Sequence, residues 1–424
     1  MRSSVKYRLT GASAAVGALL LTAGCGGGVG GDGGADAGTG FAYGADQAEV
    51  DAALADLDPV TLTIQPYAAS PDAAAAVAEQ SFMDAVEERS GGKISFEIAW
   101  GQSIAPYAEV DDALVDGRLD VAYSVPIYFQ QEYPRLDAYN KLSQYAPATP
   151  LTGEAALQAQ MSVAGWNDEA QLAEYTDKGL MPLNPLVSSG NYWTACGESG
   201  TAMGDWSGRQ IRIGGSVQTP ISESLGASPV SMEYGEAFEA LQRGTVDCIF
   251  VQGMVAGSTG LLEAAPQVST MGEDRFTGAV TAGHVAGSGV QNLPLAYQQI
   301  IFDAAGVDWM HGQVAAIIGS SADAVTDVRD AGGAFTEMDS EAAQAILDTQ
   351  AEIAEQVVAD GVIEEEVRAA LESDVDRWMD DVADLGLTDD GDLAELDEWY
   401  DPETDFRPLM ALAFQEGALA HRPE

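Results

Sequence analysis

The chain has 424 residues and a formal net charge of −49, with 18 lysines and arginines against 67 aspartates and glutamates. This length is sufficient for two domains that each bury a core. The charge argues against a nucleic-acid partner, because phosphate contacts need clustered lysine and arginine. It suits an extracellular protein in saline surroundings, where repulsion between like charges is screened.

The first 25 residues have the pattern of a secretion signal. Three basic residues precede an apolar run over 12–21, which is too short to span a membrane as a helix. The run ends at Leu21 to Cys25, a stretch that resembles a bacterial lipobox with its leucine one position early. The resemblance implies cleavage before Cys25 and lipid on its sulfur. The alternative is a plain secretory signal in which Cys25 is removed or idle.

Residues 26–57 follow this segment, and glycine, alanine and aspartate dominate their first part. Such a composition predicts a flexible tether between the anchor and the folded protein.

From residue 58 onward, predicted strands alternate with predicted helices. The first three strands cover 60–64, 94–98 and 119–123. Strands that alternate with helices predict parallel βαβ units. Ligands of open α/β sheets bind at the carboxyl ends of the strands, which makes Tyr67, Gln102 and Tyr128 candidate ligand residues. Each of the three is equally consistent with a core or loop position.

The stretch over 206–257 reads as strand, helix, strand, helix, strand. Ile211 and Ile213 flank Arg212, so the arginine faces opposite to two apolar neighbours. Gly214 and Gly215 end this strand and let the backbone come close to another group. A guanidinium presents parallel donors that match a carboxylate. The alternative is an arginine on the surface of a strand.

The order and spacing of motifs in this stretch resemble the solute receptors of tripartite ATP-independent periplasmic (TRAP) transporters, the DctP-type family. Four motifs carry the resemblance: Gly208 to Ile213, Gly226 to Val230, Glu236 to Gln242 and Gly244 to Asp247. It implies an α/β fold of the two-domain, Venus-flytrap type. It also implies a receptor that captures a small organic acid in the interdomain cleft and delivers it to membrane permease subunits, with Arg212 holding the carboxylate.

The family often carries another ligand arginine near this part of the chain, where this sequence has Tyr192 and Trp193 instead. This departure argues against a highly charged ligand such as a dicarboxylate or sialic acid. An aromatic pair predicts stacking on an apolar or planar ligand body. Gln252 is a further candidate ligand residue.

The three cysteines divide into Cys25, assigned to lipid, and the pair Cys196 and Cys248. Both members of the pair lie in or beside predicted strands of one domain, and outside the cell such a pair favours a disulfide. Closing this loop would stabilise the fold by roughly 4 kcal/mol in the chain-entropy model. The three histidines lack zinc-ligand spacing, so we expect neither a metal site nor a cofactor.

The resemblance also sets the expected domain boundaries: 58–188 with 279–320 for the first domain, 189–278 for the second, and 321–424 for a helical region that braces both. Residues 337–405 contain 25 acidic residues and only two arginines. A solvated acidic face is the favoured interpretation, and a docking surface for a membrane component is the alternative.

Two other functions are alternatives to a transport receptor. A surface-anchored hydrolase is disfavoured, because the sequence has no Gly-x-Ser-x-Gly motif and no histidine in a triad or zinc motif. We therefore expect no enzymatic activity. A ligand receptor that serves a sensor system fits the same sequence, and the sequence alone does not separate it from a transport receptor.

Overall fold

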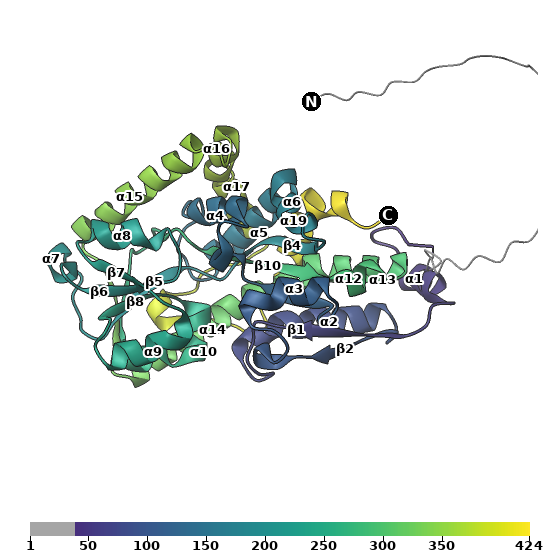
Figure 1. Ribbon diagram of the computed structural model, residues 1–424, viewed down its shortest axis with the longest axis horizontal. Coiled ribbons are helices and arrows are strands. Elements are labelled where there is room, and N and C mark those ends of the chain that lie inside the picture. Colours follow the sequence, from purple (N-terminus) through teal and green to yellow (C-terminus); the bar gives the residue numbers. More distant parts are fainter. Residues whose placement is uncertain (1–38) are drawn as a thin grey trace, which may run out of the picture. The chain divides into compact units, whose positions relative to one another are not determined.

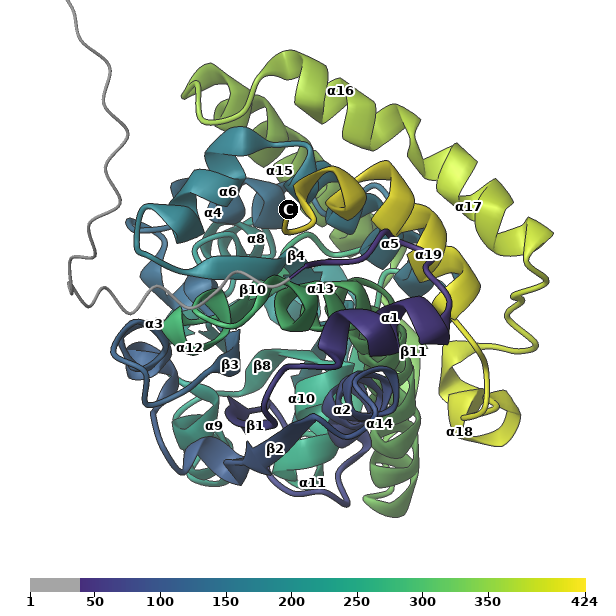
Figure 2. The same ribbon diagram turned by 90° about the vertical axis from the view of Figure 1, so that its right-hand side faces the viewer.

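The computed structural model describes residues 39–424, which form two β-sheets with surrounding helices (Figures 1 and 2). The expected signal segment, the lipidation site at Cys25 and the first part of the expected tether lie outside the described residues. Within 39–424, no helix combines the length and the apolar character needed to cross a bilayer.

The first sheet has the strand order β2-β1-β3-β10-β4. Its strands are β1 (Val60–Gln65), β2 (Ile94–Ile98), β3 (Val121–Ser124), β4 (Met181–Ser188) and β10 (Val280–Ala286). β1 pairs in parallel with β2 and β3, as the alternation of strands and helices predicted. β10 runs antiparallel to both β3 and β4, so it returns the chain to this sheet in the opposite direction.

The second sheet has the order β11-β9-β5-β8-β6-β7. Its strands are β5 (Tyr192–Cys196), β6 (Gln210–Ile213), β7 (Ser228–Ser231), β8 (Cys248–Gln252), β9 (Gln267–Thr270) and β11 (Ala334–Glu337). β6 pairs in parallel with β7 and β8, and β5 is antiparallel to β8. The carboxyl ends of β6, β7 and β8 therefore lie at the same end of the sheet as the start of β5.

The helices cover the faces of both sheets. Those up to the middle of the chain are α1 (Gln47–Leu54), α2 (Val77–Arg89), α3 (Val110–Val115), α4 (Pro134–Lys141), α5 (Thr152–Trp166), α6 (Glu169–Thr176), α7 (Met203–Trp206), α8 (Gln218–Ser224), α9 (Tyr234–Gln242), α10 (Gly253–Thr259) and α11 (Leu261–Ala264). The remainder are α12 (Ser288–Gln291), α13 (Leu295–Ala304), α14 (Met310–Asp330), α15 (Ser340–Ala359), α16 (Glu365–Ser373), α17 (Val375–Asp384), α18 (Leu396–Trp399) and α19 (Arg407–Glu416).

The tether prediction is wrong for its last part, because 47–54 form helix α1. Asp46 caps the helix in a capping box with Glu49. Val50 and Leu54 are buried in the core of the first sheet. Two apolar side chains four residues apart thus fix a segment that its composition had suggested to be flexible.

The region over 321–424, which was expected to be helical, also contains β11, which adds a parallel strand to β9 at the edge of the second sheet. α14 ends before Gly332 and Gly333. A side chain at Gly333 would lie 2.0 Å from the carbonyl oxygen of Pro266, so glycine permits the close approach of the two strands.

Two long helices contact elements of both sheets. α14 packs against α2 of the first sheet and α10 of the second. On α15, Ala342 and Ile346 belong to the apolar cluster of the second sheet, whereas Ala354 and Val357 belong to that of the first. Figure 2 shows α16 and α17 following α15 along one side of the protein.

The predicted disulfide is present and joins Cys196 to Cys248. The two residues are direct partners across the antiparallel pair of β5 and β8. The bond therefore links two neighbouring central strands of the second sheet, beside the strand that carries Arg212.

Candidate ligand-binding site

Arg212 lies on β6 with β7 on one side and β8 on the other, paired with Val230 and Ile249. Ile211 and Ile213 point into one apolar cluster, and the alternation of the strand directs Arg212 to the opposite face. Its side chain is fully buried, although the sequence alone left a surface position open.

The guanidinium of Arg212 is only partly satisfied by the protein. Nε donates to the carbonyl oxygen of Met232 at 2.8 Å, and Nη1 donates to that of Phe250 at 3.4 Å. Nη2 is buried and has no hydrogen-bond partner among the described residues. One face of the group lies on the ring of Tyr234, with Cζ 3.7 Å from the ring centroid. The guanidinium is thus held in one orientation, and its Nη2 donates no hydrogen bond within the described residues.

Arg275 provides a direct comparison, because within residues 39–424 it is the other arginine that is almost completely buried. Its Nη1 donates to Glu154 at 2.8 Å, and its other nitrogens donate to the carbonyl oxygens of Ala146 and Pro147. Arg212 has no acidic side chain within ion-pair distance in the described part of the chain. Buried charges are normally paired, so Arg212 has the surroundings of a cation that awaits an anion.

The backbone around Arg212 leaves room at the unused donor. A Cβ atom at Gly214 would lie 3.0 Å from Nη2, whereas a Cβ atom at Gly215 would meet nothing within 4 Å. The side chain of Gln218 accepts from the backbone nitrogens of both glycines, at 2.7 and 3.3 Å. These two hydrogen bonds fix the turn after β6. The turn lies at the glycine pair where the sequence predicted a close approach of the backbone to another group.

Three further polar side chains lie at the end of the second sheet where β6, β7 and β8 have their carboxyl ends. Tyr234 begins α9, and its hydroxyl is buried without a hydrogen-bond partner in the described residues. Tyr192 is buried at the start of β5 and is paired across the sheet with Gln252. Burial, followed by the nearby Tyr234, raises the pKa of Tyr192 well above its ordinary value, and Arg212 acts in the opposite direction. Gln252 donates to the carbonyl oxygen of Gly190 at 3.2 Å.

The sequence-based prediction of ligand residues did not include Tyr234. It follows the carboxyl end of β7, so the rule that selected Tyr67 after β1 would also have selected it.

The first sheet contributes Tyr67 and Tyr128 to the same neighbourhood. Burial, followed by Tyr234, raises the pKa of Tyr128 to about 12, and Arg212 lowers it. Tyr67 follows β1, and its ring lies 6.2 Å from that of Tyr107 and 5.4 Å from that of Tyr123. Tyr128 and Tyr192 thus lie close enough to Arg212 for its charge to act on them, and burial raises the pKa of both phenols.

Two of the predicted ligand residues, Gln102 and Trp193, have other structural contacts. Gln102 is exposed, and its side chain accepts from the backbone nitrogen of Tyr107, so it supports a local turn. Trp193 lies on the same sheet face as Arg212, opposite to Tyr192, because Tyr192 packs in the same apolar cluster as Ile211 and Ile213. Its ring packs edge-on against Phe335 at 5.3 Å inside an apolar cluster. The predicted stacking of Tyr192 and Trp193 together on one ligand is therefore wrong.

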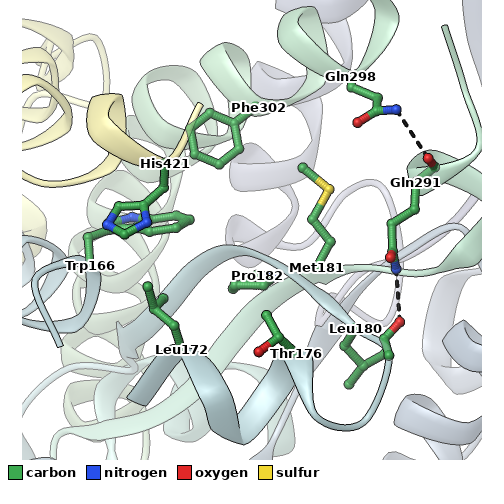
Figure 3. Close-up of a pocket in the computed structure, with 11 residues that line it drawn as sticks. Trp166, Leu172, Thr176, Leu180, Met181, Pro182, Gln291, Gln298, Phe302 and His421 are labelled. Carbon is green, nitrogen blue, oxygen red and sulfur yellow. Dashed lines mark hydrogen bonds between the residues drawn. The ribbon is translucent and has the colours of Figure 1, made fainter. Parts of the chain in front are cut away.

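A pocket of about 450 Å³ lies elsewhere, among α5, α6, β4, α13 and the residues after α19 (Figure 3). The rings of Trp166 and His421 are stacked at its wall, with centroids 5.3 Å apart. None of the predicted ligand residues lines it. No group of three or more potential metal ligands occurs within the described residues.

The two sheets and the segments that cross between them form a two-domain α/β protein, and the buried Arg212 near the strand ends is its candidate ligand-binding residue. The chain belongs to the bacterial extracellular solute-binding proteins of family 7, DctP, whose sequence profile matches residues 67–360. It is also 25% identical over 188 residues to the uncharacterized protein y4mM of Sinorhizobium fredii, which is 44% of this chain. The match spans only 33% of the length of y4mM.

Solved structures share the fold. A TRAP solute-binding protein of an unidentified marine microbe, specific for aromatic acids and bound to 3-hydroxybenzoate, is 18% identical with a TM-score of 0.62, covering 76% of this chain and 99% of the other. The sugar-acid-binding protein DctPAm of Advenella mimigardefordensis, bound to galactonate, is 18% identical with a TM-score of 0.62, covering 76% and 100%. A TRAP solute-binding protein of Shewanella oneidensis, bound to succinate, is 16% identical with a TM-score of 0.60, covering 75% and 99%. The fold is therefore the Venus-flytrap fold of this family, as the sequence predicted.

Proposed function

We propose that this protein is the receptor of a TRAP transporter, which captures a small organic acid by its carboxylate and delivers it to the membrane permease. The observation that carries the proposal is the buried Nη2 of Arg212, which has no hydrogen-bond partner in the part of the chain that the structure describes. A bound carboxylate would supply the missing counter-charge and accept a charge-assisted hydrogen bond.

A second unused donor strengthens this assignment. The buried hydroxyl of Tyr234 also has no partner in the described residues, and its ring is in contact with the guanidinium. A carboxylate has two oxygens, so one can accept from Arg212 and the other from Tyr234. Tyr192 and Gln252 complete the second-sheet side of the site, and Tyr67 and Tyr128 form the opposite side.

The ligands of the solved relatives support the chemical class. Those proteins hold 3-hydroxybenzoate, galactonate and succinate, which differ in their carbon skeletons and share a carboxylate. The net charge of −49 opposes the approach of an anion, but this repulsion is screened beyond about 8 Å at physiological salt. Local donors therefore decide the affinity, and exclusion of water as the cleft closes strengthens them.

We further propose that lipid on Cys25 holds the protein at the outer face of the membrane, on the basis of the lipobox-like sequence. Cys25→Ser should release the protein into the soluble fraction without changing its thermal unfolding. Unchanged membrane attachment of this variant would contradict lipidation at Cys25.

The transport role is tested by the molecule that accompanies the protein through purification. Mass spectrometry of the denatured protein should identify an organic acid, and prolonged incubation with the protein should leave its mass unchanged, because a receptor releases its ligand intact. Arg212→Ala should lose the acid. Arg243→Ala should retain it, because Arg243 is an exposed arginine of the same sheet region that pairs with Glu239. A neutral or cationic molecule in the wild type, or equal retention by Arg212→Ala, would contradict the proposal.

A further inference from the structure

A hydrogen bond joins the turn beside Arg212 to the first domain. The hydroxyl of Ser216 donates to Oδ1 of Asp137 at 3.3 Å, across 79 positions of the sequence. Ser216 lies in the turn between β6 and α8, and Asp137 lies on α4. Leu136 of the same helix belongs to the apolar cluster of the first sheet. The bond therefore connects the surroundings of the buried cation with the core of the other domain.

The two oxygens of Asp137 have separate partners. Lys141, one turn later on α4, donates to Oδ2 at 2.6 Å and compensates the charge, which leaves Oδ1 for Ser216. The side chain of Asp137 is only 11% exposed, so water competes little for this oxygen. An O–H···O bond is ordinarily about 2.7–2.8 Å long, so the bond to Ser216 is a long one. A movement of about half an ångström between the two domains would bring it to the ordinary length.

Asp137 is held in place through the next turn of α4. Asn140 donates through Nδ2 to the carbonyl oxygens of Gly278 and Val280, at 2.8 and 2.6 Å. These carbonyl groups lie where the chain crosses from the second sheet into β10 of the first. Because α4 is fixed to the first domain and to this crossing segment, a movement of the second domain changes the position of Ser216 relative to Asp137.

The turn that carries Ser216 also borders the donor for the anion. A Cβ atom at Gly214 would lie 3.0 Å from Nη2 of Arg212, which has no hydrogen-bond partner within residues 39–424. Gln218 accepts from the backbone nitrogens of Gly214 and Gly215, so the turn and the start of α8 are held together. An anion at Nη2 therefore lies beside the same turn that reaches the first domain through Ser216.

We propose that the bond between Ser216 and Asp137 is a latch, which tightens when the acid is bound and holds the two domains together around it. Ser216 is then a positioning residue that acts through Asp137 and does not touch the acid. This inference rests on the proposed function and adds the contact that couples occupancy of Arg212 to closure of the cleft. A bond that tightens after the acid has entered slows its departure more than its arrival.

Calorimetric titration and stopped-flow kinetics of Ser216→Ala test this proposal. The probe is the acid recovered from denatured wild-type protein, added as its pure sodium salt to protein that has been freed of it. Ser216→Ala should bind this acid about three- to tenfold more weakly, with a matching rise in the dissociation rate, because one hydrogen bond is lost. Ser216→Thr should restore both values, because it keeps the hydroxyl. Ser224→Ala is the matched control, since this hydroxyl donates to the carbonyl oxygen of Ile221 within its own helix.

A second pair of variants shows whether Asp137 is the partner. In an Asp137→Ala background, which lacks the acceptor, Ser216→Ala should weaken binding no further. An additional loss of about threefold or more would mean that Ser216 acts through another group, which would overturn the latch.

The outcomes separate this inference from the proposed function. Equal affinities of Ser216→Ala and the wild type, or a loss that Ser216→Thr does not restore, would overturn the latch. The organic-acid receptor would still stand if Arg212→Ala loses the acid. If no acid is recovered from the wild type, or if Arg212→Ala binds the acid as the wild type does, both proposals are wrong.

Discussion

The guanidinium carbon Cζ of Arg212 lies over the ring of Tyr234, 3.7 Å from its centroid, and both side chains have a buried donor without a partner in the described residues. Leaving a buried polar group unsatisfied costs about 1–3 kcal/mol. Two such groups in contact at the carboxyl ends of strands are better explained by a ligand than by the requirements of the fold.

The space in front of Arg212 gives the first prediction. Gly214→Ala places a methyl group 3.0 Å from Nη2, and Arg212 cannot retreat because Tyr234 and Met232 hold it. We expect affinity for the accompanying acid to fall by about tenfold or more, corresponding to about 1.4 kcal/mol. Gly215→Ala is the matched control, since its methyl group meets nothing within 4 Å. Equal affinities of the two variants in calorimetric titration would show that the anion does not approach at this edge.

The second prediction concerns the ion pair of Glu154 and Arg275. Glu154 also accepts from the backbone nitrogen of Asn191, so one carboxylate ties the segment before β5 to the segment before β10, where the chain crosses between the sheets. Glu154→Gln keeps the shape and leaves the buried charge of Arg275 uncompensated. We expect urea denaturation to show a loss of about 3–5 kcal/mol in the free energy of unfolding.

Arg243→Ala is the control for that experiment, because it removes an ion pair whose side chains are 73% and 66% exposed. Its effect should stay below about 1 kcal/mol, as for other exposed pairs. A similar effect of the two substitutions would mean that the crossing segments do not depend on the buried pair.

The third prediction concerns pH. Burial raises the pKa of Glu79 from 4.5 to about 7, although its carboxylate accepts a hydrogen bond from Trp309 at 2.9 Å. Because the folded-state pKa lies above the unfolded value, the folded protein binds this proton more tightly. The stability that Glu79 contributes is therefore present below about pH 4.5 and is lost as the pH rises through about 7.

Glu79→Gln should remove this dependence. Its free energy of unfolding should match that of the wild type near pH 4 and exceed it by on the order of 2–3 kcal/mol at pH 8. The proteins must be compared at each pH, because burial lowers the pKa of His284 to about 3 and destabilises the fold as the pH falls from 6.5. Glu88→Gln, at an exposed position of the same helix, controls for the loss of one negative charge. A constant difference across this pH range would contradict the prediction.

The sequence predicted those features that depend on periodicity and motif order. Alternating strands and helices predicted the βαβ units, and the spacing from Gly208 to Asp247 predicted the family and the strand of Arg212. The pairing of Cys196 with Cys248 followed from counting the cysteines. These signals are local or depend on residue type, so they can be read without coordinates.

The remaining features depend on contacts between distant segments. Trp193 was expected to stack on the ligand together with Tyr192, but its ring packs against Phe335 of β11, more than 140 residues later in the chain. Helix α1 depends on the burial of Val50 and Leu54 against elements far along the chain. The acidic partner of Arg275, and the lack of an acidic partner for Arg212 within residues 39–424, could not be read from the sequence, because nothing local distinguishes the two arginines.

Calorimetric titration of the Arg212 variants with the accompanying acid tests the central claim most directly. Arg212→Ala should weaken binding by about 2–5 kcal/mol, because the charge of the ligand would be left buried and unpaired. Arg212→Lys should lie between Arg212→Ala and the wild type, since lysine supplies the charge without the planar set of donors. Arg243→Ala should bind as the wild type does. If Arg212→Ala remains folded and binds the acid within about twofold of the wild type, which is less than about 0.5 kcal/mol, Arg212 belongs to the scaffold and the organic-acid assignment is wrong.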